Sequence, residues 1–136
     1  MYKRYTHEGG VATPLIVHWP AGLKSQGELR HAPSHIIDIA PTCLSAAGLS
    51  VKGMEGKSLL PVFVRDSKEE RTLYWEHEGN RAVRKGNYKL VAMHDTPWEL
   101  YDMNKDRSEL TDLSKKMAGK AKELRLLYEA WAKRVG

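Results

Sequence analysis

The sequence predicts an α+β fold, in which a four-stranded antiparallel sheet packs against a long C-terminal helix and is preceded by one strand and one helix of a separate unit. Three observations support this prediction. Residues 72–103 hold four short runs rich in aromatic and β-branched residues, separated by turn residues. Residues 110–135 repeat apolar side chains at spacings of three and four, which gives a helix one apolar face. Residues 15–48 hold a short apolar run and then a helical pattern.

The predicted strands form a meander and cover Thr72 to His77, Arg81 to Arg84, Tyr88 to Met93 and Trp98 to Met103. Turn residues at 78–80, 85–87 and 95–97 separate them. The middle turn contains a glycine that can take positive φ, as a three-residue hairpin with a bulge requires. In the third strand the alternation does not decide which face is the core, although Lys89 indicates that its own face is the wetter one.

The last predicted element is a helix whose apolar stripe runs from Leu110 to Val135. Ser114 is a candidate N-cap of the main helix, after a preliminary turn at Ser108 to Leu113. Gly119 weakens the helix interior by about 1 kcal/mol relative to alanine. We expect this stripe to pack as core against the sheet rather than to bind a partner helix.

Two elements are predicted before the sheet. Leu15 to Val17 is an apolar run that Pro20 soon ends, which predicts a short buried strand. The pattern after Ser34, a candidate N-cap, predicts a short helix that ends at Gly48 in the left-handed conformation. Pro41 predicts either a kink in this helix or a break with a second start at the proline.

Polar residues of the predicted helix have structural interpretations. His35 and Asp38 fall on neighbouring turns, and we interpret them as a solvated or capping pair rather than as ligands. Cys43 is interpreted as a buried helix residue. Since it is the single cysteine of the sequence, neither an internal disulfide nor a cysteine metal cluster is expected.

Composition narrows the class of partner. The sequence has 22 Lys and Arg against 17 Asp and Glu, a net charge of +5, and the basic residues are spread along the chain. Because basic blocks with interleaved aromatic residues are missing, we expect no nucleic-acid partner, while an anionic substrate stays compatible with the charge. No apolar run approaches the roughly 20 residues that span a bilayer, so no membrane partner is expected.

Sequence motifs in a fixed order run through nearly the whole chain. The first, K-x-x-x-x-E-G-G-x-x-x-P-x-I-x-x-W-P, extends from Lys3 to Pro20. The second, D-x-x-P-T-x-L-x-x-x-G, extends from Asp38 to Gly48. Further matches lie at residues 56–59, 75–91 and 98–113. Together they resemble the C-terminal part of the formylglycine-dependent sulfatases, which form the arylsulfatase family of the alkaline-phosphatase-like superfamily.

The resemblance implies an organisation for the chain. Residues 1–64 would be the C-terminal edge of a truncated α/β catalytic domain, carrying its last strand and helix. Residues 72–136 would be a small α+β subdomain that caps the active-site cleft, and the charged run at 65–71 would join them. The partners implied are a sulfate-ester substrate and the rest of the catalytic domain, in a protein that is periplasmic or secreted.

The resemblance also implies a reaction, the hydrolysis of sulfate esters by a formylglycine nucleophile beside calcium or a similar divalent cation. The nucleophile motif C/S-x-P-x-R does not occur here, since Cys43 is followed by Leu-Ser-Ala, and the Asp-Asp of the metal site is also missing. We therefore expect no cofactor and no metal ligands in this chain, and no activity from the chain alone.

Five residues are candidates for the site. Lys3 lies five residues before the Glu8 of the first motif, which matches the family lysine that contacts the sulfate, so the resemblance implies a catalytic role. His7 is either a cleft residue or a packed one. We hypothesise that His77, Asn80 and Arg81 reach over the cleft from the first turn of the meander and set specificity; an ordinary hairpin turn is the alternative.

Two other functions stay open at this level. One is a stand-alone module that binds an anionic glycan through Trp75, Trp98 and basic residues, and the other is a structural interaction module that only caps the parent domain. If the chain is the truncated part that the resemblance implies, the apolar strand and helix at 15–48 would ordinarily pack on a larger sheet that is not present in the chain. We therefore expect the isolated chain to self-associate.

Overall fold

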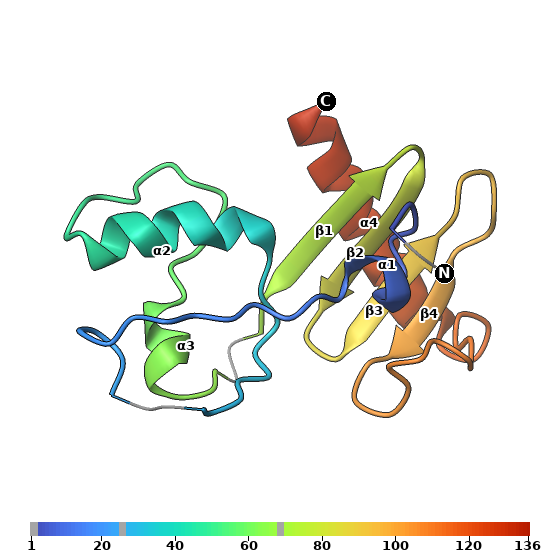
Figure 1. Ribbon diagram of the computed structural model, residues 1–136. Coiled ribbons are helices and arrows are strands. Elements are labelled where there is room, and N and C mark those ends of the chain that lie inside the picture. Colours follow the sequence, from blue (N-terminus) through green and yellow to red (C-terminus); the bar gives the residue numbers. More distant parts are fainter. Residues whose placement is uncertain (1–2, 25–26, 68–69) are drawn as a thin grey trace. The chain divides into compact units, whose positions relative to one another are not determined.

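The computed structural model describes residues 3–24, 27–67 and 70–136 (Figure 1). The chain divides into two compact units, which we call the helical unit, residues 15–69, and the sheet unit, residues 1–14 and 70–136. The helical unit contains the 3₁₀ helix η1 (Ile36–Asp38), α2 (Ile39–Ala46) and α3 (Leu60–Val64). The sheet unit contains α1 (Glu8–Val11), β1 (Thr72–His77), β2 (Asn80–Lys85), β3 (Tyr88–Ala92), β4 (Glu99–Asp102) and α4 (Ala118–Val135). Within the described ranges, no helix has both the length and the apolar character to cross a membrane.

The four strands form an antiparallel meander in the order β1-β2-β3-β4, which confirms the predicted α+β fold. Cross-strand register defines two faces, because side chains that lie opposite one another share a face. One row on the first face is Tyr74, Val83, Leu90 and Leu100; the adjacent row on the second face is Trp75, Ala82, Val91 and Glu99.

The two tight turns of the meander are both two residues long. Glu78 and Gly79 join β1 to β2 with φ values of 52° and 79°, and two positive φ values are what a type I′ hairpin turn requires. Between β2 and β3 we expected three loop residues, but Lys85 and Tyr88 pair directly. Only Gly86, with φ of 55°, and the residue after it are left in that loop.

The first face of the sheet packs against α4. Val83, Leu90 and Leu100 form a buried cluster with Leu124 and Tyr128 of the helix, so the middle of the apolar stripe is core, as predicted. The two ends of the stripe are not, since Leu110 is 83% exposed and Val135 is 54% exposed. At the edge of this cluster the Tyr74 ring of β1 stacks on the Trp131 ring of α4, with centroids 5.0 Å apart.

The C-terminal helix begins at Ala118 and not at Ser114. Ser114 does not cap it because both its backbone N–H and its hydroxyl donate to the Asp112 carboxylate, at 2.7 and 2.8 Å. The same carboxylate accepts the N–H of Leu100, at 3.0 Å, and so ties the turn to β4. Gly119 therefore lies in the first turn of the helix rather than in its interior.

The second face of the sheet is covered too, and the expectation that the Lys89 face is the wetter one was wrong. This face carries a second buried cluster of Ala82, Val91, Tyr101 and Met103, and Lys89 beside it is 0% exposed. Figure 1 shows α1 on the side of the sheet opposite α4. The N-terminal segment supplies the carboxylate that pairs with this lysine, which is why a lysine can be buried here.

In the helical unit the predicted strand at Leu15 to Val17 is absent, and Ile16 is 88% exposed. A strand needs a neighbour for its backbone N–H and C=O groups. Among the described residues of 15–69 no other segment forms a strand, so within this unit the apolar run has no strand to pair with.

The predicted break with a second start at Pro41 is absent: η1 runs directly into α2, which begins at Ile39 and contains Pro41. η1 has His35, not Ser34, as its N-cap: the His35 ring accepts the N–H of Ile37, and Asp38 accepts the N–H of His35 at 2.8 Å. The capping interpretation of this pair is thus confirmed. α2 follows directly at Ile39, and Pro41 falls in its first turn, where no intrahelical N–H is needed.

Cys43 is exposed, although we expected it to be buried. The side of α2 that makes contacts is the one facing the 57–59 loop, where Lys57 N–H donates to Asp38 and Leu59 N–H donates to Thr42. Cys43 is one residue beyond Thr42 and so lies about 100° round the helix from that side. Gly48, with φ of 72°, ends the helix region in the left-handed conformation, as predicted.

Candidate functional site

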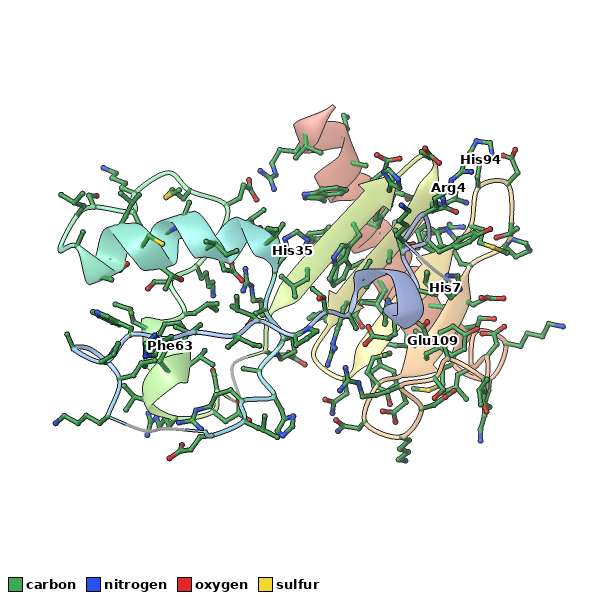
Figure 2. The ribbon with its side chains drawn as sticks, viewed as in Figure 1. Arg4, His7, His35, Phe63, His94 and Glu109 are labelled. Atoms are coloured by element: carbon green, nitrogen blue, oxygen red, sulfur yellow. The ribbon has the colours of Figure 1, made fainter. Side chains whose placement is uncertain are left out.

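The candidate site is the N-terminal segment, residues 3–11, held on the second face of the sheet. It begins with Lys3, which is exposed, and ends with α1. Figure 2 shows Arg4 near the β1–β2 turn, and His7 and Glu109 beside α1. Two groups of contacts fix the segment, one at each end.

The first anchor is Asn80, at the start of β2. Its side-chain amide donates to the carbonyl oxygens of Arg4 and His77, each at 3.0 Å, and its oxygen accepts the N–H of His94 at 3.2 Å. Asn80 is 7% exposed, so both amide hydrogens are used inside the protein. The ion pair of Arg4 with Glu78 lies beside it, but both side chains are largely exposed and the pair contributes little.

The second anchor is a buried ionic cluster around Lys89. The Lys89 ammonium donates to Glu8 Oε1 at 3.2 Å and lies 2.9 Å from Glu109 Oε1. Glu109 Oε2 accepts the backbone N–H of Glu8 at 2.7 Å, and Arg107 pairs with Glu8 Oε2 at 3.3 Å. Glu8, the first residue of α1, is therefore bound through both its side chain and its backbone.

Two features show how constrained Glu109 is. Its φ is +55°, in the left-handed region that costs a non-glycine residue about 1 kcal/mol or more. Its Oε1 is buried and lies against Lys89 as a charge contact without hydrogen-bond geometry. The surrounding contacts must therefore outweigh the backbone strain at this residue.

The cluster keeps Glu8 ionised. Burial by itself raises the pKa of Glu8, but the charges and hydrogen bonds of Lys89 and Arg107, together with the charge of Arg84, outweigh it. The pKa of Glu8 therefore lies below its ordinary value of 4.5. Glu8 is therefore ionised at neutral pH.

His7 belongs to a neighbouring polar group. It is 5% exposed, and its Nε2 lies 3.3 Å from Glu99 Oε2, which also accepts the Tyr101 hydroxyl hydrogen at 3.0 Å. Burial first, and then the Glu99 carboxylate, raise the pKa of Tyr101, so it stays protonated as the donor. His7 Nδ1 and Thr6 Oγ1 are buried, and neither has a hydrogen-bond partner within the described ranges.

The structure does not gather the five predicted site residues into one cluster. Lys3 is exposed, and His7 is packed. Asn80 is buried and donates to the carbonyl of Arg4, the residue after Lys3. His77 is exposed at the end of β1. Arg81 follows Asn80 and so points to the opposite face, where its guanidinium lies 4.8 Å from the Trp98 ring centre.

Sequence reasoning missed the residues that hold the segment, namely Lys89, Arg107 and Glu109. One signal was present: a lysine in the otherwise apolar strand Tyr88 to Ala92 is expected to be buried with a partner if both faces of the sheet are covered. The partner on α1 lies 81 residues away in sequence, which no local pattern reveals.

The described residues do not provide a metal site. Across 3–24, 27–67 and 70–136, no three His, Cys, Asp or Glu side chains are grouped so that they could hold an ion. The carboxylates of the second anchor are instead neutralised by lysine and arginine. These residues thus do not fit the divalent cation that the resemblance implies, and we derive no step through it.

Comparison with known proteins identifies the family. The family model described as N-sulphoglucosamine sulphohydrolase, C-terminal, matches residues 1–129. The chain belongs to this family. It is thus a C-terminal part of a sulfatase, as the ordered motifs indicated.

Individual sulfatases agree with this assignment. The chain is 32% identical over 148 residues to an uncharacterised sulfatase of Schizosaccharomyces pombe, covering 94% of this chain and 26% of that protein. It is 32% identical over 145 residues to the N-acetylglucosamine-6-O-sulfatase of Bacteroides thetaiotaomicron, covering 93% and 26%. The sulfatase C-terminal part described here therefore spans about a quarter of the length of these relatives.

The fold is also shared with a solved protein. A structure from work on the metabolism of multiple glycosaminoglycans by Bacteroides thetaiotaomicron superposes with a TM-score of 0.79 and 21% identity. The match covers 94% of this chain and 30% of that one. It shows that the α+β architecture of the sulfatase C-terminal part is common to both.

Proposed function

We propose that this chain acts within an enzyme that hydrolyses the sulfate ester of a carbohydrate, and that its chemical contribution there is the ammonium group of Lys3. One observation carries the proposal: Lys3 is exposed, while the residues immediately after it are fixed to the sheet at Arg4 and Glu8. The segment thus presents a free lysine from a rigid support. Membership of the sulfatase family supports the choice of sulfate as its target.

The chemistry asked of Lys3 is electrostatic. When the bond between sulfur and the ester oxygen breaks, negative charge grows on the oxygen atoms. A lysine ammonium is a compact point charge with three donors, which suits such a group. Interactions that strengthen as charge develops lower the barrier, and removing one such donor from an enzyme typically costs about 10²–10³ in kcat.

For the substrate, the relative named N-acetylglucosamine-6-O-sulfatase favours a sulfated sugar. We propose that the sheet unit caps the cleft of the parent enzyme, with His77 and Arg81 contributing to specificity from the β1–β2 turn. Of the four residues expected to bind substrate, His77 is exposed, whereas His7 and Asn80 are buried. Unchanged kcat/KM for every sulfate ester after His77→Ala and Arg81→Ala would contradict the specificity role.

The first test uses the chain by itself. We expect the purified 136-residue chain to release no sulfate from an aryl sulfate, with or without added calcium, because the formylglycine motif is missing from its sequence. The measurement is sulfate release against a full-length family sulfatase as positive control. Metal-dependent turnover by the chain would contradict the proposal that it contributes Lys3 and not the nucleophile.

The second test uses the full-length enzyme that contains this chain. Lys3→Ala should lower kcat about 10²–10³-fold, with a smaller change in KM, because the interaction strengthens as charge develops on the oxygen atoms. Lys105→Ala is the matched control, since the Lys105 side chain is 85% exposed and its ammonium lies 4.0 Å from Asp102. Equal activity of the two variants would exclude a catalytic Lys3.

The glycan-binding alternative has no comparable support. A sugar-binding aromatic residue needs an open ring face, but Trp98 packs edge-to-face on Tyr128 and under Arg81. Trp75 packs on the buried cluster of the second face, with the Lys89 ammonium 5.9 Å from its ring centre. We therefore propose only the sulfatase function.

A further inference from the structure

We infer that the small sheet sets the position of Lys3, with Asn80 and Lys89 as the positioning residues. The inference rests on the proposed role of Lys3 in sulfate-ester hydrolysis. It assigns to the C-terminal sheet a task beyond capping: residues that do not touch the substrate would fix where the lysine stands.

The contacts hold the segment that directly follows Lys3. Asn80 holds the carbonyl of Arg4, the residue next to Lys3, and Lys89 holds the carboxylate of Glu8, five residues on. Between these points the chain makes a turn and enters α1, whose N–H groups at Gly10 and Val11 donate to His7 O. Two fixed points and a hydrogen-bonded turn hold the backbone from Arg4 to Val11, and Lys3 is the residue directly before the first fixed point.

The burial of Lys89 argues for a role in placement. An ion pair that is removed from water is seldom more stable than apolar side chains of the same size, because desolvation cancels much of the attraction. Lys89 is 0% exposed and lies on the face of an apolar cluster, where an apolar residue would pack. A buried lysine with two carboxylates accepts one arrangement of α1, whereas an apolar contact would tolerate sliding.

Charge balance gives the same result. The carboxylates of Glu8 and Glu109 are paired with Lys89 and Arg107, and the charge of Arg84, which lies opposite Lys89 on β2, also acts on Glu8. Arg107 is 67% exposed, so water screens it, whereas Lys89 is fully buried and contacts both Glu8 and Glu109. Without Lys89 the two carboxylates repel, and we expect α1 to leave the sheet while the sheet itself remains.

The experiment is a double-mutant cycle in the full-length sulfatase that contains this chain. Lys89→Met and Asn80→Ala should each lower kcat about 10–100-fold with a smaller change in KM, since a misplacement of about 1 Å costs roughly 100-fold. In the Lys3→Ala background the same changes should cost no more than roughly twofold, because they act through Lys3. The control is Lys85→Met: Lys85 pairs with Glu123 on the opposite face, and its loss should leave kcat unchanged.

A loss of equal size in the Lys3→Ala background would overturn the inference, since the residues would then act elsewhere. Unchanged kcat in both single variants would overturn it as well. If Lys89→Met does not fold, Asn80→Ala decides, because it leaves the ionic cluster intact.

Hydrogen exchange on the 136-residue chain separates this inference from the proposed function. In Lys89→Met the amides of residues 8–12 should lose protection while those of β2 and β3 keep it. If residues 8–12 keep their protection in Lys89→Met, this result alone refutes the anchoring by Lys89. A wild-type enzyme without sulfatase activity would instead refute the proposed function.

Discussion

At the scale of single residues, Glu8 makes the clearest prediction about pH. Its folded pKa lies below its ordinary value of 4.5, so the folded state binds its proton less readily than the unfolded state. The stability that Glu8 contributes is therefore full above about pH 4.5 and is lost as pH falls through the folded pKa. Lys89, Arg107 and Arg84 are the groups that face it and favour its charge.

Urea unfolding from pH 7 down to about pH 3 checks this prediction. The free energy of unfolding of the wild-type chain should exceed that of Glu8→Gln near pH 7, and the difference should shrink below about pH 4.5. Glu129→Gln is the control, because the Glu129 side chain is 55% exposed and pairs with Arg125 one turn away. A difference for Glu8→Gln that does not change with pH would contradict the assignment.

The same residues show how far the sequence reaches at this scale. The K-x-x-x-x-E-G-G motif placed Lys3 and Glu8 in a family, but it did not reveal that Glu8 is bound by Lys89. The wrong expectation for Lys89 had a physical cause. A charged side chain in a strand indicates a solvent-exposed face only if no other segment covers that face of the sheet. Such a covering segment can lie far away in sequence, so the strand itself does not reveal it.

At the scale of elements, α4 contributes through a few buried side chains. Leu124 is fully buried between the helix and the sheet, whereas Leu126 on the same helix is 52% exposed. Leu124→Ala should therefore lower the free energy of unfolding by about 2–5 kcal/mol, through lost burial and a cavity. Leu126→Ala should change it by no more than about 0.5 kcal/mol. Equal effects of the two changes in denaturant unfolding would mean that α4 does not pack as described.

Element prediction succeeded where the partners are local. The four strands pair with their neighbours through short turns, so alternation and turn residues such as Gly79 and Gly86 were sufficient. It failed where a partner is missing or unexpected. The apolar run at 15–17 forms no strand, and the start of α4 was misplaced because the Asp112 carboxylate binds Ser114 in a turn.

At the scale of the whole molecule, the two units differ in how far their apolar side chains are buried. The sheet unit has two buried clusters, one on each face of its sheet. In the helical unit the largest apolar side chains are instead often exposed: Ile16, Leu29, Ile36 and Val64 are 76% to 88% exposed. In sulfatases about four times as long as this chain, we expect the remaining domain to cover these residues.

This contrast predicts self-association of the isolated chain. Exposed apolar side chains gathered in one unit lower the free energy when they are buried, and a second copy offers the same surface. The weight-average mass in sedimentation should therefore rise with concentration. The double variant Ile16→Glu, Ile36→Glu should reduce that rise, because a charge at these positions opposes burial.

The matched control is Leu110→Glu, since Leu110 is 83% exposed but belongs to the sheet unit, whose apolar clusters are already covered. It should leave the concentration dependence as in the wild type. A monomer at every concentration would show that the helical unit covers its apolar side chains without a partner. An equal effect of Leu110→Glu and the double variant would instead place the association surface outside the helical unit, and the uncovered residues of 15–69 would then not be the cause.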